Sequence, residues 1–170
     1  MHTVQAVTLR RLTFQDEVSL AQLANNKKVW ENLRDYFPHP YAVEHAHQFI
    51  RLVQEENPPL TFAITCHDQL CGVISLVRQT DVYRFTAEIG YWLGEPFWHQ
   101  GIAPRAVQLI TAYGFQELGL ARIYAGIFEY NAASMRVLEK CGYQKEGIFK
   151  KAIFKNGKFW NEHRYAIVQG

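Results

Sequence analysis

The loop at residues 98–103 combines residue types that are suited to binding a phosphate group. Its sequence is Trp-His-Gln-Gly-Ile-Ala, and Pro104 follows it at the start of a predicted helix. The first helical turn has unpaired N–H groups and a partial positive charge, and Gly101 lets a pyrophosphate approach the main chain closely. Taken alone, the glycine and proline equally indicate a tight loop that only starts a helix, because neither a Walker lysine nor a GxGxxG pattern is present.

Two other places in the sequence carry polar residues at positions suited to chemistry. Asn131 is a residue type favoured at the N-cap of a helix, and Ser134 follows three positions later. Gly142 is suited to end the helix that begins at Asn131. Glu88 lies in a predicted strand whose apolar residues, including Ile89, alternate along one face. The alternation places Glu88 on the opposite face.

The elements that position these residues form one mixed pattern of strands and helices. Alternation, helical spacing and turn residues predict strands over 7–12, 61–66, 71–77, 84–93 and 122–128, helices over 16–24 and 43–55, a helix from near Pro104 to Gly119, a helix from Asn131 to Gly142, and a closing hairpin over 143–168 around Asn156-Gly157. This order predicts one mixed α/β sheet with helices on its faces.

Composition narrows the possible classes of protein. With 170 residues, of which 48% are hydrophobic, the chain suits a single domain. The net charge of +2 gives no support for nucleic-acid or membrane-surface binding. An odd count of three cysteines, no signal-like pattern over 1–12 and no apolar run of about 18 residues predict a cytoplasmic protein without disulfides or membrane spans.

Four segments together resemble the GNAT acetyltransferases. They are Glu-Ile-Gly-Tyr-Trp-Leu at 88–93, the loop at 98–103, the helix at 131–143 and Glu146-Gly147. The pattern is most similar to the branch that acetylates serine or alanine N-termini of ribosomal proteins, and it covers nearly the whole chain. The resemblance implies a single N-acetyltransferase domain over 1–170 of the α/β (α+β) class. Its central sheet would be mixed, mostly antiparallel and splayed at the middle, with helices on both faces.

The resemblance also implies a set of residues that bind acetyl-coenzyme A. Main-chain groups of Tyr91, Trp92 and Leu93 would bind the pantetheine and the thioester carbonyl. The pyrophosphate would bind to the segment that contains His99, Gln100, Gly101, Ile102, Ala103 and Arg105, and Asn131 and Ser134 would lie near the thiol. No metal is expected.

Acetyl transfer to an amine assigns roles to two of these residues. An amine must lose its proton to attack a thioester, and Glu88 could accept that proton, directly or through water. Ser134 could stabilise or protonate the departing thiolate, and neither Ser134 nor Cys141 need form an acyl-enzyme. The alternatives are a strand glutamate paired with Arg84 and a polar residue that only follows the Asn131 cap.

The acceptor is predicted to be a primary amine, either a peptide N-terminus or a small molecule. The resemblance places the acceptor loop between Trp30 and Tyr41, where Glu31, Asp35 and Tyr36 would suit a cationic amine. A loop packed by its own aromatic residues would have a similar composition. Monomer and homodimer both remain open.

Two other functions are weighed against the enzyme. The first is a non-catalytic acyl-CoA-binding regulatory module, because cofactor binding and transfer are separable. The second is a nucleic-acid binder that would use Lys150, Lys151, Lys155 and Lys158 among aromatic residues. An alternating hairpin with one wet face explains these lysines better, and solvated side chains explain His39, His45 and His47 better than a metal site.

Overall fold

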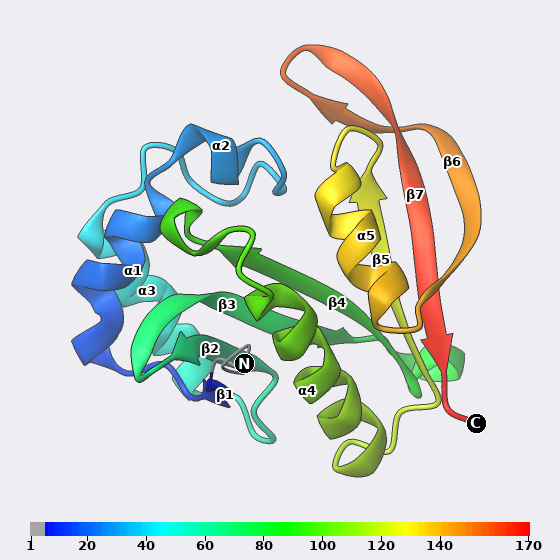
Figure 1. Ribbon diagram of the computed structural model, residues 1–170, viewed down its shortest axis with the longest axis horizontal. Helices are drawn as coiled ribbons and strands as arrows, with labels where there is room; N and C mark the ends of the chain where they lie inside the picture. Colours follow the sequence, from blue (N-terminus) through cyan, green and yellow to red (C-terminus); the bar gives the residue numbers. More distant parts are fainter. Residues whose placement is uncertain (1–5) are drawn as a thin grey trace, which may run out of the picture. The chain divides into compact units, whose positions relative to one another are not determined.

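The fold is seen in a computed structural model that describes residues 6–170 (Figure 1). The strands are β1 (Val7–Arg10), β2 (Thr61–Cys66), β3 (Gln69–Arg78), β4 (Thr86–Leu93), β5 (Arg122–Phe128), β6 (Gln144–Lys155) and β7 (Lys158–Val168). The α-helices are α1 (Glu17–Ala24), α2 (Lys27–Trp30), α3 (Val43–Gln54), α4 (Ile102–Gln116) and α5 (Ala132–Lys140). Three short 3-10 helices are η1 (Phe14–Asp16), η2 (Asp81–Tyr83) and η3 (Glu95–Phe97). The predicted order is confirmed, and α2 is added to it.

The strands form one seven-stranded sheet in the order β1-β2-β3-β4-β5-β7-β6. The pairs β1–β2, β2–β3, β5–β7 and β6–β7 are antiparallel, whereas β4 and β5 run parallel. The predicted mixed, mostly antiparallel sheet is therefore confirmed.

The parallel pair β4–β5 is short. Its register joins Thr86 to Arg122, Ala87 to Ile123 and Glu88 to Tyr124. Within the described residues the pairing ends there, although both strands continue. Glu88 and Tyr124 are therefore the last residue pair of this parallel register.

The chain divides into two compact units, which are described separately. The first runs to Ser75 and also contains Tyr91–Leu109, and the second comprises Leu76–Gly90 and Ile110–Gly170. Residues 1–5, where the single-domain and signal-peptide predictions begin, lie outside the described residues. None of the helices within 6–170 is long and apolar enough to cross a bilayer.

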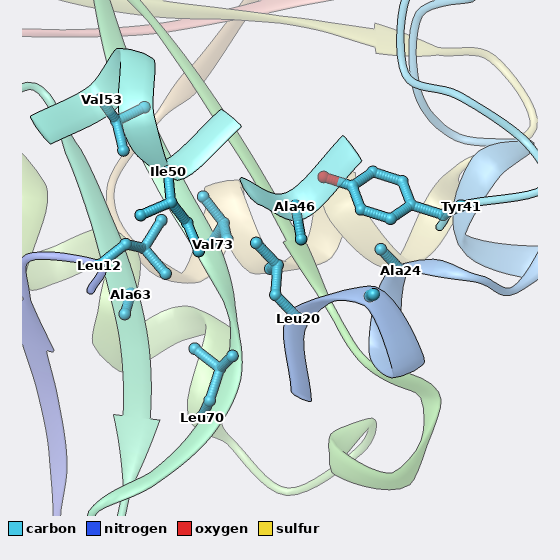
Figure 2. Packing of buried hydrophobic residues seen from close by; sticks show 11 residues of the cluster. Leu12, Leu20, Ala24, Tyr41, Ala46, Ile50, Val53, Ala63, Leu70 and Val73 are labelled. Atoms are coloured by element: carbon cyan, nitrogen blue, oxygen red, sulfur yellow. The ribbon is translucent and has the colours of Figure 1, made fainter. Parts of the chain in front are cut away.

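The core of the first unit lies where α1 and α3 pack against β2 and β3 (Figure 2). Ala46, Ile50 and Val53 recur at helical spacing in α3, and all three are buried. Leu20 of α1 packs into the same cluster and is only 1% exposed. Most of the apolar residues that predicted these helices are therefore on the buried face, whereas Val18 of α1 and Leu52 of α3 are exposed.

A buried carboxylate fixes the start of α1. Both carboxylate oxygens of Asp16 accept hydrogen bonds from the Arg10 guanidinium, each at 2.8 Å, and one also accepts from the Thr13 N–H at 2.8 Å. Burial acts to raise the pKa of Asp16, but these hydrogen bonds outweigh it and hold the pKa below its usual value. The ion pair thereby joins β1 to α1.

The second unit is built on β5, β6 and β7 and is covered on one face by helices. Ile123, Ala125 and Ile127 alternate along β5 and are buried. The Tyr165 hydroxyl of β7 donates to Glu139 of α5 at 2.8 Å, so α5 lies on the same face as Ala125, the register partner of Tyr165. The opposite face of β5 carries Tyr124 and is partly exposed.

Two details of the predicted elements are wrong. Helix α4 begins at Ile102 rather than near Pro104, because the Ile102 side chain is buried and adds to the helical stripe. In the closing hairpin, Lys155 is 2% exposed, whereas Phe154 and Phe159 are 59% and 65% exposed. A register shift between Phe149 and Ile153 interrupts the alternation, so the expected wet face of lysines does not hold at the tip.

Candidate active site

Side-chain hydrogen bonds to the main chain hold the loop between β4 and α4. The Trp98 indole N–H donates to the Leu93 carbonyl at 2.9 Å, and the Gln100 side-chain amide donates to the Pro96 carbonyl at 2.9 Å. These contacts fold the loop back onto the end of β4 and onto η3. The loop therefore has a defined shape before any ligand arrives.

The backbone conformation of the loop suits the close approach of a ligand. Gly101 has φ +76° and His99 has φ +61°, both in the left-handed region that favours glycine. A Cβ at Gly101 would meet no atom within 4 Å among the described residues, so space is open above this main chain.

The start of α4 supplies donors and one cation. The N–H groups of Ile102 and Ala103 in the first turn have no partner within an α-helix, whereas Pro104 has no N–H to offer. The Ile102 side chain is buried and anchors the turn, while Arg105 is exposed. An anion here would meet backbone donors, the helix dipole and a guanidinium.

The end of β4 combines core contacts with accessible main chain. The Trp92 ring packs against the core of the first unit and makes an edge contact with Phe37, with ring centroids 5.7 Å apart. The Gly94 N–H donates to the Cys71 carbonyl at 2.8 Å. The Trp92 side chain is thus structural, and its predicted cofactor role is restricted to its main chain. Tyr91 and Leu93 are half-buried.

The predicted acceptor residues lie just after α2. Glu31 is half-buried, Asp35 is exposed and the Tyr36 side chain is 84% exposed. Asn26 and Lys28, which precede them, both donate to the Glu95 carboxylate of η3, at 2.7 Å each. This tie between α2 and η3 was not predicted, because it joins segments about 70 residues apart.

Glu88 occupies the position predicted from strand alternation. It is half-buried on the face opposite Ala87 and Ile89, which are both buried. Its Oε2 atom accepts a hydrogen bond from the Tyr124 hydroxyl at 3.4 Å. Tyr124 was missed in the sequence, although the alternation along β5 already placed it opposite Ile123 and Ala125.

Asn131 and Ser134 form the predicted helix start. The Asn131 side-chain oxygen accepts from the Ser134 N–H at 3.3 Å, so Asn131 is the N-cap of α5. Ser134 is half-buried. Because the cap uses the backbone of Ser134, its hydroxyl is not needed for capping.

The predicted residues divide between the two units. The loop 98–105, the end of β4 and the acceptor candidates belong to the first unit, whereas Glu88, Asn131 and Ser134 belong to the second.

The histidines weighed as a metal site, His39, His45 and His47, have structural partners. His45 Nδ1 accepts from the Ala42 N–H at 2.9 Å, His47 lies 2.9 Å from the Glu17 carboxylate, and His39 stacks on Trp30. Within residues 6–170, no three His, Cys, Asp or Glu side chains are grouped to hold a metal ion.

Comparison with known proteins decides the family. A model of the acetyltransferase (GNAT) domain matches residues 6–144. The chain belongs to the GNAT acetyltransferases. The GNAT membership inferred from the resemblance is thereby confirmed, and so is the predicted N-acetyltransferase activity with acetyl-coenzyme A as cosubstrate.

Individual GNAT relatives differ in what they acetylate. An uncharacterized N-acetyltransferase of Bacillus subtilis, YnaD, is 30% identical over 171 residues, covering 99% of this chain and 98% of the relative. The spermidine N(1)-acetyltransferase of Escherichia coli is 29% identical over 171 residues, covering 99% of this chain and 89% of the relative. The structure of RimL, a ribosomal-protein α-N-acetyltransferase in complex with coenzyme A, superimposes with a TM-score of 0.84 and has 24% sequence identity. The match covers 98% of this chain and 95% of the RimL chain. At that identity the likeness to RimL concerns the fold.

Proposed function

We propose that this GNAT enzyme acetylates a cationic primary amine by direct transfer, with Glu88 as the general base. The observation that carries the proposal is the position of Glu88 in the last residue pair of the β4–β5 register. A half-buried carboxylate at the end of this pairing is suited to take a proton from the acceptor ammonium, directly or through water. The neutral amine nitrogen then attacks the thioester carbonyl carbon.

Collapse of the tetrahedral intermediate breaks the carbon–sulfur bond, and coenzyme A leaves as the thiolate with the bonding electron pair. The attacking nitrogen, which became cationic on forming the new carbon–nitrogen bond, releases one further proton, and this proton neutralises the thiolate. The Ser134 hydroxyl donates a hydrogen bond or a proton to this sulfur, and Asn131 positions Ser134 through the helix cap. No covalent enzyme intermediate is formed in this sequence.

The cofactor contacts follow from the accessible main chain. Backbone groups of Tyr91, Trp92 and Leu93 bind the pantetheine. The N–H groups and side chains of the loop bind the pyrophosphate, namely those of His99, Gln100, Gly101, Ile102, Ala103 and Arg105. The open space above Gly101 and the exposed guanidinium of Arg105 support this assignment.

Spermidine is the first acceptor to test, because the full-length likeness to the spermidine N(1)-acetyltransferase is accompanied by exposed acidic and aromatic residues after α2. Asp35 and Glu31 would attract a cationic amine, and Tyr36 would contact its alkyl chain. A peptide with a serine N-terminus is the alternative acceptor. We place the enzyme in the cytoplasm as one domain over 1–170, active as a monomer or homodimer without nucleic acid or membrane.

A Glu88→Gln variant tests the base. Release of the coenzyme A thiol with spermidine, and separately with the peptide, should be roughly 10²- to 10⁴-fold slower at neutral pH. Acetyl-coenzyme A affinity, measured by calorimetry, should stay the same because Glu88 does not bind the cofactor. Glu146→Gln is the matched control, since Glu146 is an exposed carboxylate paired with Arg122 in the same unit. A full rate in Glu88→Gln would remove Glu88 from the mechanism.

A further inference from the structure

The face of the second unit that carries Glu88 also holds an arginine between two aromatic rings. The guanidinium carbon of Arg164 in β7 lies 4.6 Å from the ring centroid of Tyr124 in β5 and 4.4 Å from that of Phe149 in β6. Both distances are within the range of cation–π contacts. Arg164 therefore bridges the two strands on either side of its own.

The residues opposite Arg164 in the two neighbouring strands are glycines. Its register partner in β5 is Gly126 and its partner in β6 is Gly147. Neither glycine adds a side chain on this face, and the space over Gly126 is taken by the Glu162 carboxylate.

An ion pair fixes the orientation of the guanidinium. Arg164 donates from Nη2 and Nε to Glu162 Oε2, at 2.9 and 3.2 Å. The Glu162 carboxylate lies over Gly126, where a Cβ would collide with it. The Arg164 and Glu162 side chains are 28% and 17% exposed, so this pair is partly screened from water. The planar fork is thus held by two rings and one carboxylate.

Tyr124 connects the stacked arginine to the proposed base, because its ring contacts Arg164 and its hydroxyl contacts Glu88. A tyrosine ring has only two side-chain torsions, so packing one face against a fixed guanidinium restricts where its hydroxyl points. That hydroxyl donates to Glu88 Oε2. We infer that Arg164 and Tyr124 are positioning residues, which orient the Glu88 carboxylate at the end of the β4–β5 pairing. This inference rests on the proposed role of Glu88 as the base.

The first test observes Glu88 without requiring a turnover assay. The side-chain carboxyl ¹³C resonance of Glu88 is assigned by its loss in Glu88→Gln. We expect Tyr124→Phe to move this resonance, because the hydroxyl donor is lost. Arg164→Lys should also move it, because a lysine keeps the charge but lacks the planar group that stacks. In the Tyr124→Phe background, Arg164→Lys should add little further change.

Arg136→Lys is the control, because Arg136 is exposed on α5, which lies on the face of β5 opposite Tyr124. It should leave the Glu88 resonance in place. If Arg164→Lys does not move that resonance, or moves it equally with and without the Tyr124 hydroxyl, the positioning role is overturned.

Kinetics give the second test. Arg164→Lys and Tyr124→Phe should each lower kcat roughly tenfold while the KM for acetyl-coenzyme A stays unchanged. The double variant should be no slower than the worse single variant. Full activity in Glu88→Gln would refute the base itself, whereas a slow Glu88→Gln beside fully active Arg164→Lys would refute only the positioning role.

Discussion

Gly72 of β3 lies directly against the main-chain carbonyl of Trp92 in β4. A Cβ at Gly72 would collide with that oxygen and would lie 2.9 Å from the Leu93 Cα atom. The backbone at 91–93, which we propose binds pantetheine, therefore occupies its position only because residue 72 has no side chain. Because backbone cannot move aside as a side-chain end can, Gly72→Ala should lower the free energy of unfolding by about 2–4 kcal/mol. Urea denaturation measures this loss.

Gly147→Ala is the control for that experiment. Gly147 also lies in a strand, but the nearest atom to an added Cβ would be Phe149 Cε1 at 3.9 Å, which is ordinary contact. Its unfolding free energy should change by no more than roughly 1 kcal/mol. Equal losses in the two variants would show that the collision at Gly72 is relieved.

A comparison of alanine variants at Gly101 and Gly119 distinguishes the effect of backbone strain on stability from an effect on cofactor binding. Both have positive φ, +76° and +66°, and an added Cβ would have open space at either one. Alanine should therefore cost each a similar stability, roughly 1–2 kcal/mol. Only Gly101→Ala should weaken acetyl-coenzyme A binding, and Gly101→Trp should weaken it further.

Calorimetric titration with acetyl-coenzyme A measures this difference, with adenosine diphosphate as the ligand that reports binding through phosphates alone. Unchanged affinity in Gly101→Trp would remove the loop from the cofactor site. A loss of affinity shared equally by Gly119→Ala would attribute the effect to the fold.

Asn131 and Ser134 should have separable effects. Asn131→Ala removes the N-cap of α5 and should cost about 1 kcal/mol of stability. Ser134→Ala keeps the N–H that the cap uses, so the N-cap should remain while kcat falls, because the thiolate loses its hydroxyl partner. Thermal unfolding and thiol release measured on the same samples distinguish the two. An equally active Ser134→Ala would exclude the hydroxyl from the reaction.

The Arg10–Asp16 pair should make the free energy of unfolding fall at acidic pH. The pKa of Asp16 lies below its ordinary value, so the folded state binds the proton less readily than the unfolded chain. The contribution of the pair is complete above the unfolded pKa of about 3.9 and is lost as pH falls from there through the lower folded value.

An Asp16→Asn variant removes this dependence. It should be less stable than the parent at pH 7, by about 1–3 kcal/mol, and the gap should narrow below about pH 4. Urea midpoints at a series of pH values provide the measurement. A gap that stays constant down to pH 2 would contradict the linkage.

Local sequence signals predicted most elements, because the bounds of these elements are determined by residues close to them in the sequence. The strand Thr61–Cys66 follows Pro58-Pro59, and the turn Asn156-Gly157 has the positive φ angles that this dipeptide favours. Helix α2 was missed because it has only four residues, and it is supported by an Asn26 cap and by contacts of Asn26 and Lys28 with Glu95. Lys155 was misplaced because a register shift between strands has no signature in one strand alone.

In the candidate site, too, positions that are set within one segment were predicted, whereas contacts between strands were not. Alternation placed Glu88 on its face, and the cap rule placed Asn131. The contact of Tyr124 with Glu88, and the stack on Arg164, depend on which strands are neighbours and in what register. Those pairings arise from packing of the whole sheet, so periodicity within a segment could not reveal them.

The glycine opposite Arg164 in β5 has an evolutionary consequence. A side chain at 126 would displace Glu162, whose carboxylate pairs with Arg164. Mutations at 126, 162 and 164 are therefore not independent of one another. Among descendants of this sequence, the three positions should change together, and a lineage that gains a side chain at 126 should also lose the ion pair.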